Sequence, residues 1–104
     1  MDVGCGAGDL SLALASRIGP RGHVLGIDIS APLLDVARER LRDIPPGSAP
    51  VDFRRGDAAS LDLGPDRDLI VSRFGVMFFD DPAAAFGQLR RNLKPHGRLA
   101  VLCW

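Results

Sequence analysis

The chain has 104 residues, with 13 basic and 13 acidic side chains, so its formal net charge at neutral pH is zero. This length predicts one small domain, and the balanced charge, without a long run of Lys or Arg, argues against nucleic acid or an anionic membrane as partner. The hydrophobic share of 46% is ordinary for a globular protein, and no apolar stretch is long enough to span a bilayer.

The N-terminal stretch reads DVGCGAGD over Asp2–Asp9 and places glycine at every second position between residues 4 and 8. The apolar spacing that follows predicts a helix over Asp9–Ile18, ended by Gly19-Pro20. An extended start, a glycine turn and a helix in this order are typical of a nucleotide-binding loop, since glycine permits a tight turn and close approach of a ligand. Glycine-rich turns are common, so this pattern needs support from the rest of the chain.

The remainder of the chain alternates between predicted strands and helices. The segments are, in order, a strand over His23–Asp28; a helix capped by Ser30, with an apolar stripe of Leu33, Leu34, Ala37, Leu41 and Ile44, ended by Pro45-Pro46-Gly47; a strand over Val51–Arg54; a loop over Ala58–Pro65; a strand over Asp68–Ser72; a phenylalanine-rich connection over Arg73–Asp80; a helix opened by Asp81-Pro82; a turn at Pro95-His96-Gly97; and a strand over Arg98–Trp104.

Mostly continuous apolar strands separated by helices indicate a parallel sheet that is covered on both faces. Right-handed crossovers leave few ways of arranging such strands. We predict an α/β fold with a Rossmann-like, doubly wound parallel sheet of about five strands in the order 3-2-1-4-5 and helices on both faces. Residues 1–104 are expected to form this one domain.

Polar residues end four of the predicted strands, namely Asp2, Asp28, Asp57 and Ser72-Arg73. Asp28 lies about 20 residues beyond the glycine loop, where a carboxylate can accept hydrogen bonds from both hydroxyls of a ribose. Asp57 is placed to accept from an exocyclic amine such as that of adenine. A single aspartate of this kind more often caps a turn, but a set at successive strand ends favours a binding site.

Four segments jointly resemble the successive motifs of class I S-adenosylmethionine-dependent methyltransferases. These are Asp2–Gly8 (DVGCGAG), Val24–Ser30 (VLGIDIS), Gly56-Asp57-Ala58 and Leu93–Leu99 (LKPHGRL). The resemblance covers almost the whole chain and is closest to the small-molecule branch related to quinone-biosynthesis C-methyltransferases. The segment Ser72–Asp80 (SRFGVMFFD), with Cys103-Trp104, is similar to a bacterial subgroup of that family.

The resemblance implies S-adenosyl-L-methionine as cofactor and a small-molecule methyl acceptor as substrate. The cofactor-binding positions that it implies are Asp2, Gly4, Gly6, Gly8, Asp28, Ile29, Asp57, Ala58, Ser72 and Arg73. Asp2 would hold the methionine amino end, Asp28 the ribose hydroxyls, and Asp57 the adenine edge. Ser72 and Arg73 would lie beneath the methionine portion and face the acceptor. His96 departs from the glycine usual in its turn.

Two other interpretations stay open. An NAD(P)-binding Rossmann module calls for Gly-x-Gly-x-x-Gly, but here the third glycine comes one residue early, at Gly8, and Asp9 at the helix start would oppose a bound pyrophosphate. By comparison with the family, the chain is expected to be truncated at both ends, which allows a non-catalytic fragment. The open edge of the fifth strand is then expected to permit self-association.

No catalytic residue and no metal ligand is assigned from the sequence. His23 and His96 are expected at the end of the sheet away from the cofactor. Arg73 is equally suited to orient a substrate and to form a structural ion pair. For Phe74, Phe78 and Phe79 we favour packing in the core over a role as walls of a substrate pocket. For Leu33 we favour a core role over contact with adenine.

The two cysteines, Cys5 and Cys103, do not form a disulfide framework. We expect both to be free thiols, with Cys5 as a small packing residue, and the protein to be cytoplasmic. Trp104 is expected at the ligand-binding end of the sheet.

Overall fold

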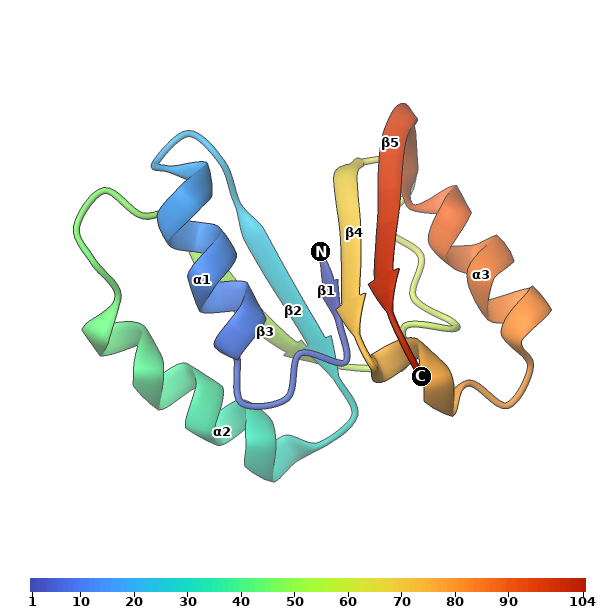
Figure 1. Ribbon diagram of the computed structural model, residues 1–104, viewed down its shortest axis with the longest axis horizontal. Coiled ribbons are helices and arrows are strands. Elements are labelled where there is room, and N and C mark those ends of the chain that lie inside the picture. The colour runs from blue at the N-terminus through green and yellow to red at the C-terminus, as the bar shows by residue number, and fades with distance from the viewer.

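A five-stranded parallel sheet forms the centre of the computed structural model, which describes residues 1–104 (Figure 1). The strands follow the order β3-β2-β1-β4-β5, and every neighbouring pair is parallel. This confirms the predicted order, in which the chain runs outward from β1 to β3, returns to the centre, and runs outward again from β4 to β5. The strands are β1 (Asp2–Val3), β2 (Val24–Asp28), β3 (Val51–Arg55), β4 (Arg67–Arg73) and β5 (Leu93–Leu102).

The helices cover both faces of the sheet, as predicted. Alternate residues of β2 point to opposite faces: Val24 packs with Ala15 of α1 (Asp9–Ile18), whereas Leu25 and Ile27 share a core with Leu89 of α3 (Pro82–Arg91). The remaining helix, α2 (Ala31–Arg40), lies beside α1 and buries Leu34 and Ala37 against Phe53 of β3 (Figure 1). None of the helices has the length and apolarity needed to span a bilayer.

Side-chain caps open the second and third helices where the sequence predicts them. The Ser30 hydroxyl accepts from the Leu33 amide at 3.4 Å, and the Asp81 carboxylate accepts from the Ala84 amide at 3.1 Å. Each cap satisfies one of the amides that have no partner inside the helix. Gly8 precedes α1 instead, in a left-handed conformation and without a side-chain cap.

Several boundaries differ from the prediction. The helix α2 ends at Arg40 and continues as a short 3₁₀ turn, η1 (Leu41–Asp43). The phenylalanine-rich connection contains a second 3₁₀ turn, η2 (Gly75–Phe78). The last strand begins at Leu93, five residues before Arg98. The predicted turn at Pro95-His96-Gly97 lies within this strand, where the pairing register with β4 shifts between Arg67 and Leu69. The strand ends at Leu102, so Trp104 lies beyond it.

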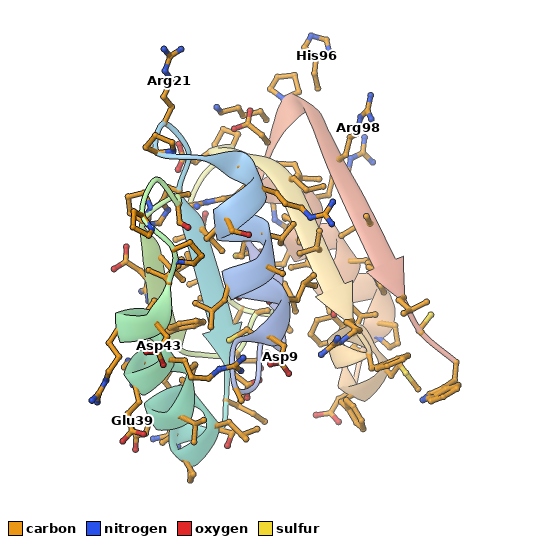
Figure 2. All side chains as sticks on the ribbon, turned by 60° about the vertical axis from the view of Figure 1, so that its left-hand side comes forward. Asp9, Arg21, Glu39, Asp43, His96 and Arg98 are labelled. Carbon is orange, nitrogen blue, oxygen red and sulfur yellow. The ribbon has the colours of Figure 1, made fainter.

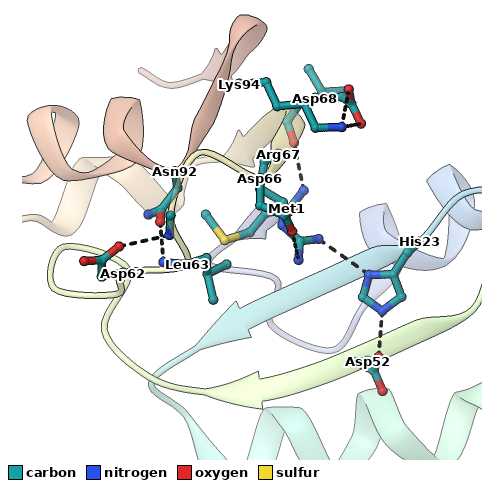
Figure 3. A network of polar contacts seen from close by, with 12 residues as sticks. Met1, His23, Asp52, Asp62, Leu63, Asp66, Arg67, Asp68, Asn92 and Lys94 are labelled. Atoms are coloured by element: carbon teal, nitrogen blue, oxygen red, sulfur yellow. Dashed lines mark hydrogen bonds and ion pairs between the residues drawn. The ribbon is translucent and has the colours of Figure 1, made fainter.

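Asn92, fully buried between α3 and β5, fixes the long loop that precedes β4 (Figure 3). Its side-chain amide donates to the Leu61 carbonyl at 2.8 Å and to the Gln88 carbonyl at 3.2 Å, and its oxygen accepts from the Leu63 amide at 2.6 Å. The Asn92 carbonyl also accepts from the Arg67 amide at 2.9 Å. One polar side chain therefore holds a loop whose own residues form no regular element.

Replacing this side chain should destabilise the chain strongly. Asn92→Ala leaves the Leu63 amide without its partner. It also removes one of the two side-chain donors to the Leu61 carbonyl, which Gln88 Nε2 also contacts at 2.9 Å. We expect a loss of roughly 2–3 kcal/mol in the free energy of unfolding, measured by urea denaturation. Ser48→Ala, which removes only an exposed hydrogen bond to Pro45, is the control and should change stability by less than about 0.5 kcal/mol. Equal stabilities of the two variants would contradict this role of Asn92.

Candidate functional site

A cleft of about 650 Å³ opens beyond the carboxyl ends of the strands, which is where ligands bind in sheets of this type. It brings together residues from the glycine loop, from the ends of β2, β3 and β4, and from the start of α3. Seven of the ten predicted cofactor-binding residues line it, namely Gly4, Gly6, Asp28, Ile29, Asp57, Ala58 and Arg73. Predicted site residues as far apart in the sequence as Gly4 and Arg73 thus share one site.

The carboxylate of Asp28 holds the glycine loop in place. One oxygen accepts from the Gly6 amide and the other from the Ser30 amide, both at 2.8 Å. The Ile27 carbonyl accepts from the amides of Gly4 and Cys5 at 2.8 and 3.0 Å. The end of β2 therefore shapes the loop after β1, and each Asp28 oxygen keeps further acceptor capacity for hydroxyl groups in the cleft.

The glycine loop also meets the loop after β4, backbone against backbone. A Cβ added to Gly75 would lie 2.5 Å from the Val3 carbonyl oxygen and 2.9 Å from the Gly4 Cα. A Cβ on Gly4 would in turn lie 2.7 Å from the Gly75 Cα, and Gly4 has a φ of 71°. Only glycine permits this approach, so Gly75 belongs to the site as much as the three glycines of the loop do.

Three predicted site residues lie behind the cleft lining. Asp2 is buried and accepts from the Ser11 hydroxyl at 2.6 Å; its burial raises the pKa of its carboxyl group above the ordinary value. Gly8 packs against Phe53 and Ala37. The Ser72 hydroxyl donates to the Val3 carbonyl at 2.8 Å and accepts from the Val76 amide at 3.2 Å. These side chains support the loops, and their contact with a cofactor stays a prediction.

Asp9, at the first position of α1, is paired with two arginines. Arg40 Nη1 lies 2.6 Å from one carboxylate oxygen, and Arg73 Nη2 lies 3.7 Å from the other. Arg40 also donates to the Ala7 carbonyl at 2.9 Å, which ties α2 to the glycine loop. Both roles suggested for Arg73 are compatible with this position, since it joins a long ion pair and lines the cleft.

The cleft is acidic. Its lining contains four aspartates, Asp28, Asp57, Asp80 and Asp81, against the single basic residue Arg73. A site with this balance favours a ligand of positive charge and disfavours one that carries several phosphates. Asp9 lies outside the cleft lining, and its carboxylate occupies the N-terminus of α1, where an anion would otherwise bind.

Several lining residues were assigned to the core from the sequence, and that interpretation was wrong for two of them. Leu33 is 44% exposed at the cleft, and Phe78 is 81% exposed. Phe79 does pack in the core, edge to face with Phe86 at 6.0 Å between ring centres, while also reaching the cleft. The helical period that identified Leu33 cannot distinguish a core position from the adjacent rim.

Phe74 has a backbone conformation that phenylalanine rarely adopts. Its φ is 69°, the only positive value at a non-glycine residue, and such strain costs of order 1–3 kcal/mol. Its amide donates to the Leu102 carbonyl at 2.7 Å, and its ring stacks on Trp104 with 5.1 Å between centres and 6° between planes. No sequence signal announced this conformation, which orients the chain between β4 and η2.

The two histidines lie at the opposite end of the sheet, as expected. His96 and Arg21 point away from the end of the molecule that carries Asp9 (Figure 2). His23 Nε2 lies 2.6 Å from Asp52, and Arg67 approaches its other ring nitrogen at 3.5 Å, within a polar network around the start of β4 (Figure 3). Neither ring can reach a reacting group in the cleft.

Cys5 is confirmed as a packing residue beneath the glycine loop. It is buried with Leu34, Ala37 and Phe53. Burial raises the pKa of its thiol to about 12, assisted by the carboxyl groups of Asp2 and Asp28, so the thiol has little nucleophilic character at neutral pH. No three His, Cys, Asp or Glu side chains are grouped so that they could hold a metal ion.

The fold and the cleft define an α/β domain of the kind that binds a nucleoside-containing cofactor at its first loop. The family model described as "Methyltransferase domain" matches residues 1–97. The chain therefore belongs to the methyltransferase domain family.

Individual relatives agree with this assignment. The chain is 38% identical over 103 residues to 2-phytyl-1,4-naphtoquinone methyltransferase of Synechococcus elongatus, covering 98% of this chain and 44% of that protein. It resembles the crystal structure of a SAM-dependent methyltransferase from Aquifex aeolicus with a TM-score of 0.84 and 28% identity, over 99% of this chain and 54% of that one. It also resembles the [4+2]-cyclase SpnF, with a TM-score of 0.80 and 30% identity over 96% and 36% of the two chains.

The contact between Gly4 and Gly75 can be tested with a pair of glycine substitutions. Gly75→Ala places a methyl group against backbone atoms and should lower the free energy of unfolding by roughly 1–3 kcal/mol. Gly87→Ala, within α3 and with no atom near its added Cβ, should raise it by about 0.5–1 kcal/mol. Urea denaturation measures both. A fully stable Gly75→Ala variant would show that the two loops do not meet as described.

Proposed function

We propose that this chain binds S-adenosyl-L-methionine in the cleft and forms the cofactor-binding part of an enzyme that methylates a small molecule. The chain spans about 44% of the length of the naphthoquinone methyltransferase that it resembles, so the activity of the whole protein is part of the proposal. The observation that carries it is the acidic cleft between the glycine loop and the ends of β2 and β3.

The residues present fit this cofactor. Asp28 lies at the end of β2 with acceptor capacity for the ribose hydroxyls, and Asp57 follows β3 where the adenine edge would lie. Ile29 and Leu33 offer apolar surface beside Asp28 for the adenine ring. The cofactor would bring a sulfonium cation with an activated methyl group and no phosphate, which suits the acidic lining of the cleft.

The chain's contribution to methyl transfer is to hold the two reactants in line. When bound, the cofactor would supply a methyl group that its sulfonium already activates, so the residues that line the cleft would contribute mainly by holding the acceptor in line with that methyl group. Gly4 and Gly75 fix the walls of the cleft, and Arg73 is the one cation placed to orient an oxygen-bearing acceptor. No side chain of this chain is assigned as a base.

The acceptor that we propose is a flat, ring-containing small molecule related to a quinone. The relatives of this chain include a protein named 2-phytyl-1,4-naphtoquinone methyltransferase and one named demethylmenaquinone methyltransferase, from Lactobacillus johnsonii. The similarity to a [4+2]-cyclase shows that the fold also hosts other chemistry. Cofactor binding is therefore the first property to measure.

Calorimetric titration with S-adenosylhomocysteine, with NADH as the competing ligand, tests the cofactor site. We expect S-adenosylhomocysteine to bind and NADH not to bind. Asp28→Asn should weaken binding roughly 10–100-fold, since a hydrogen bond to a charged group contributes about 1.5–3 kcal/mol. Asp35→Asn makes the same charge change on the exposed side of α2 and should leave the affinity unchanged. Binding of NADH alone would contradict the proposal.

We also propose that the chain self-associates through β5. This ten-residue strand pairs only with β4, and its apolar residues Leu99, Val101 and Leu102 are 39%, 42% and 56% exposed. An unpaired edge with apolar side chains is a ready surface for another strand. Sedimentation velocity should show a mass that rises with protein concentration, and a monomer at every concentration would contradict the proposal.

The cytoplasm is the compartment that fits two free thiols, one of them the exposed Cys103. Recovery of the protein mainly from an extracellular fraction would contradict this assignment.

A further inference from the structure

One part of the cleft lies beyond the residues to which the proposed function assigns the ribose and the adenine. The lining beyond Gly4, Asp28 and Asp57 comes from the segment after β4 and from the start of α3. This second part is lined by Arg73, Phe74, Gly75, Phe78, Phe79, Asp80, Asp81, Ala84 and Ala85. Three of these nine residues are aromatic, whereas the other part of the cleft contains no aromatic residue.

Phe78 is largely exposed to solvent, which is unfavourable for a large apolar side chain. Its side chain is 81% exposed although it belongs to the short η2 turn, whose neighbour Val76 is buried. Phe79, the next residue, shows the alternative, since it packs on Phe86 within the core. The turn therefore directs one ring into the protein and presents the other at the cleft.

Phe74 adds a second, rigid surface to the same part of the cleft. Its ring stacks on Trp104 almost in parallel, and its φ of 69° occurs directly before Gly75, which contacts Gly4 and Val3. A residue held in an unfavourable conformation by its surroundings points to a functional constraint. The residue with this conformation lines the cleft next to Arg73.

We propose that Phe74 and Phe78 form the acceptor subsite, which binds a flat, uncharged aromatic ring that carries an oxygen substituent. The two phenylalanines supply apolar, stacking surface for the ring. Arg73, half exposed and with only the 3.7 Å contact to Asp9, is free to donate a hydrogen bond to the oxygen. The inference rests on the proposed function, since it assumes that the cofactor occupies the other part of the cleft.

Trp104 provides the measurement, because it is the only tryptophan in the chain and stacks on Phe74. The 104-residue chain is titrated with 2,3-dimethyl-1,4-naphthoquinone, whose substituted ring carbons do not add readily to the exposed Cys103 thiol, while tryptophan emission is followed. We expect saturable quenching by the quinone. Cyclohexane-1,4-dione carries two carbonyl groups without an aromatic ring and should produce no saturable change. Quenching that rises linearly for both compounds would overturn the subsite.

Two variants of the same turn separate the subsite from general effects on the protein. Phe78→Ala should weaken naphthoquinone binding at least tenfold while changing the affinity for S-adenosylhomocysteine less than twofold. Met77→Ala removes the neighbouring side chain, which is 39% exposed but does not line the cleft, and should leave both affinities unchanged. Equal naphthoquinone affinity in Phe78→Ala and the unmodified chain would overturn the inference.

The failure of the inference is distinguishable from failure of the proposed function. Binding of S-adenosylhomocysteine without saturable naphthoquinone binding refutes the subsite and leaves the cofactor site intact. Naphthoquinone binding that depends on Phe78, without binding of S-adenosylhomocysteine, supports an aromatic-ring site and refutes the proposed function.

Discussion

The carboxylate of Asp28 is the group on which the architecture of the cleft depends. It closes hydrogen bonds to the amides of Gly6 and Ser30, and so joins the loop after β1 to the start of α2. The neighbouring Ile27 carbonyl completes the attachment by accepting from Gly4 and Cys5. In the proposed function the same carboxylate binds the ribose, so one side chain both shapes the site and contacts its ligand. A ligand hydroxyl then meets a carboxylate that is already fixed, which lowers the entropic cost of binding.

Charge distinguishes this cleft from that of a dinucleotide-binding protein with a similar sheet. The carboxylate of Asp9 occupies the N-terminus of α1, where a pyrophosphate would otherwise bind, and ion pairs with Arg40 and Arg73 hold the carboxylate in this position. The cleft lining itself contains four aspartates. The topology alone is shared by many cofactor classes, and the acidic residues are what favour a cationic nucleoside over a phosphorylated one.

Most of the fold was predictable because it depends on local signals. Apolar runs, Pro and Gly punctuation and the capping residues Ser30 and Asp81 identified the strands and helices, and seven of the ten predicted site residues line the cleft. The start of β5 was not predictable, because it depends on how its residues pair with β4. The role of Gly75 and the left-handed Phe74 were also hidden, since both arise from a contact with a loop about 70 positions earlier in the chain.

The central strand has a consequence for the order in which the protein can assemble. The pair of residues that form β1 must join β2 on one side and β4 on the other, and the residues of β4 are made some 65 positions later. During synthesis the first three strands can pair while β1 still has an open edge. Val3, Leu25 and Ile27, which α3 eventually covers, then face water or a chaperone until residues 56–91 have emerged. The cleft therefore forms late, because its lining comes both from the first three strands and from the segments that are synthesised after them.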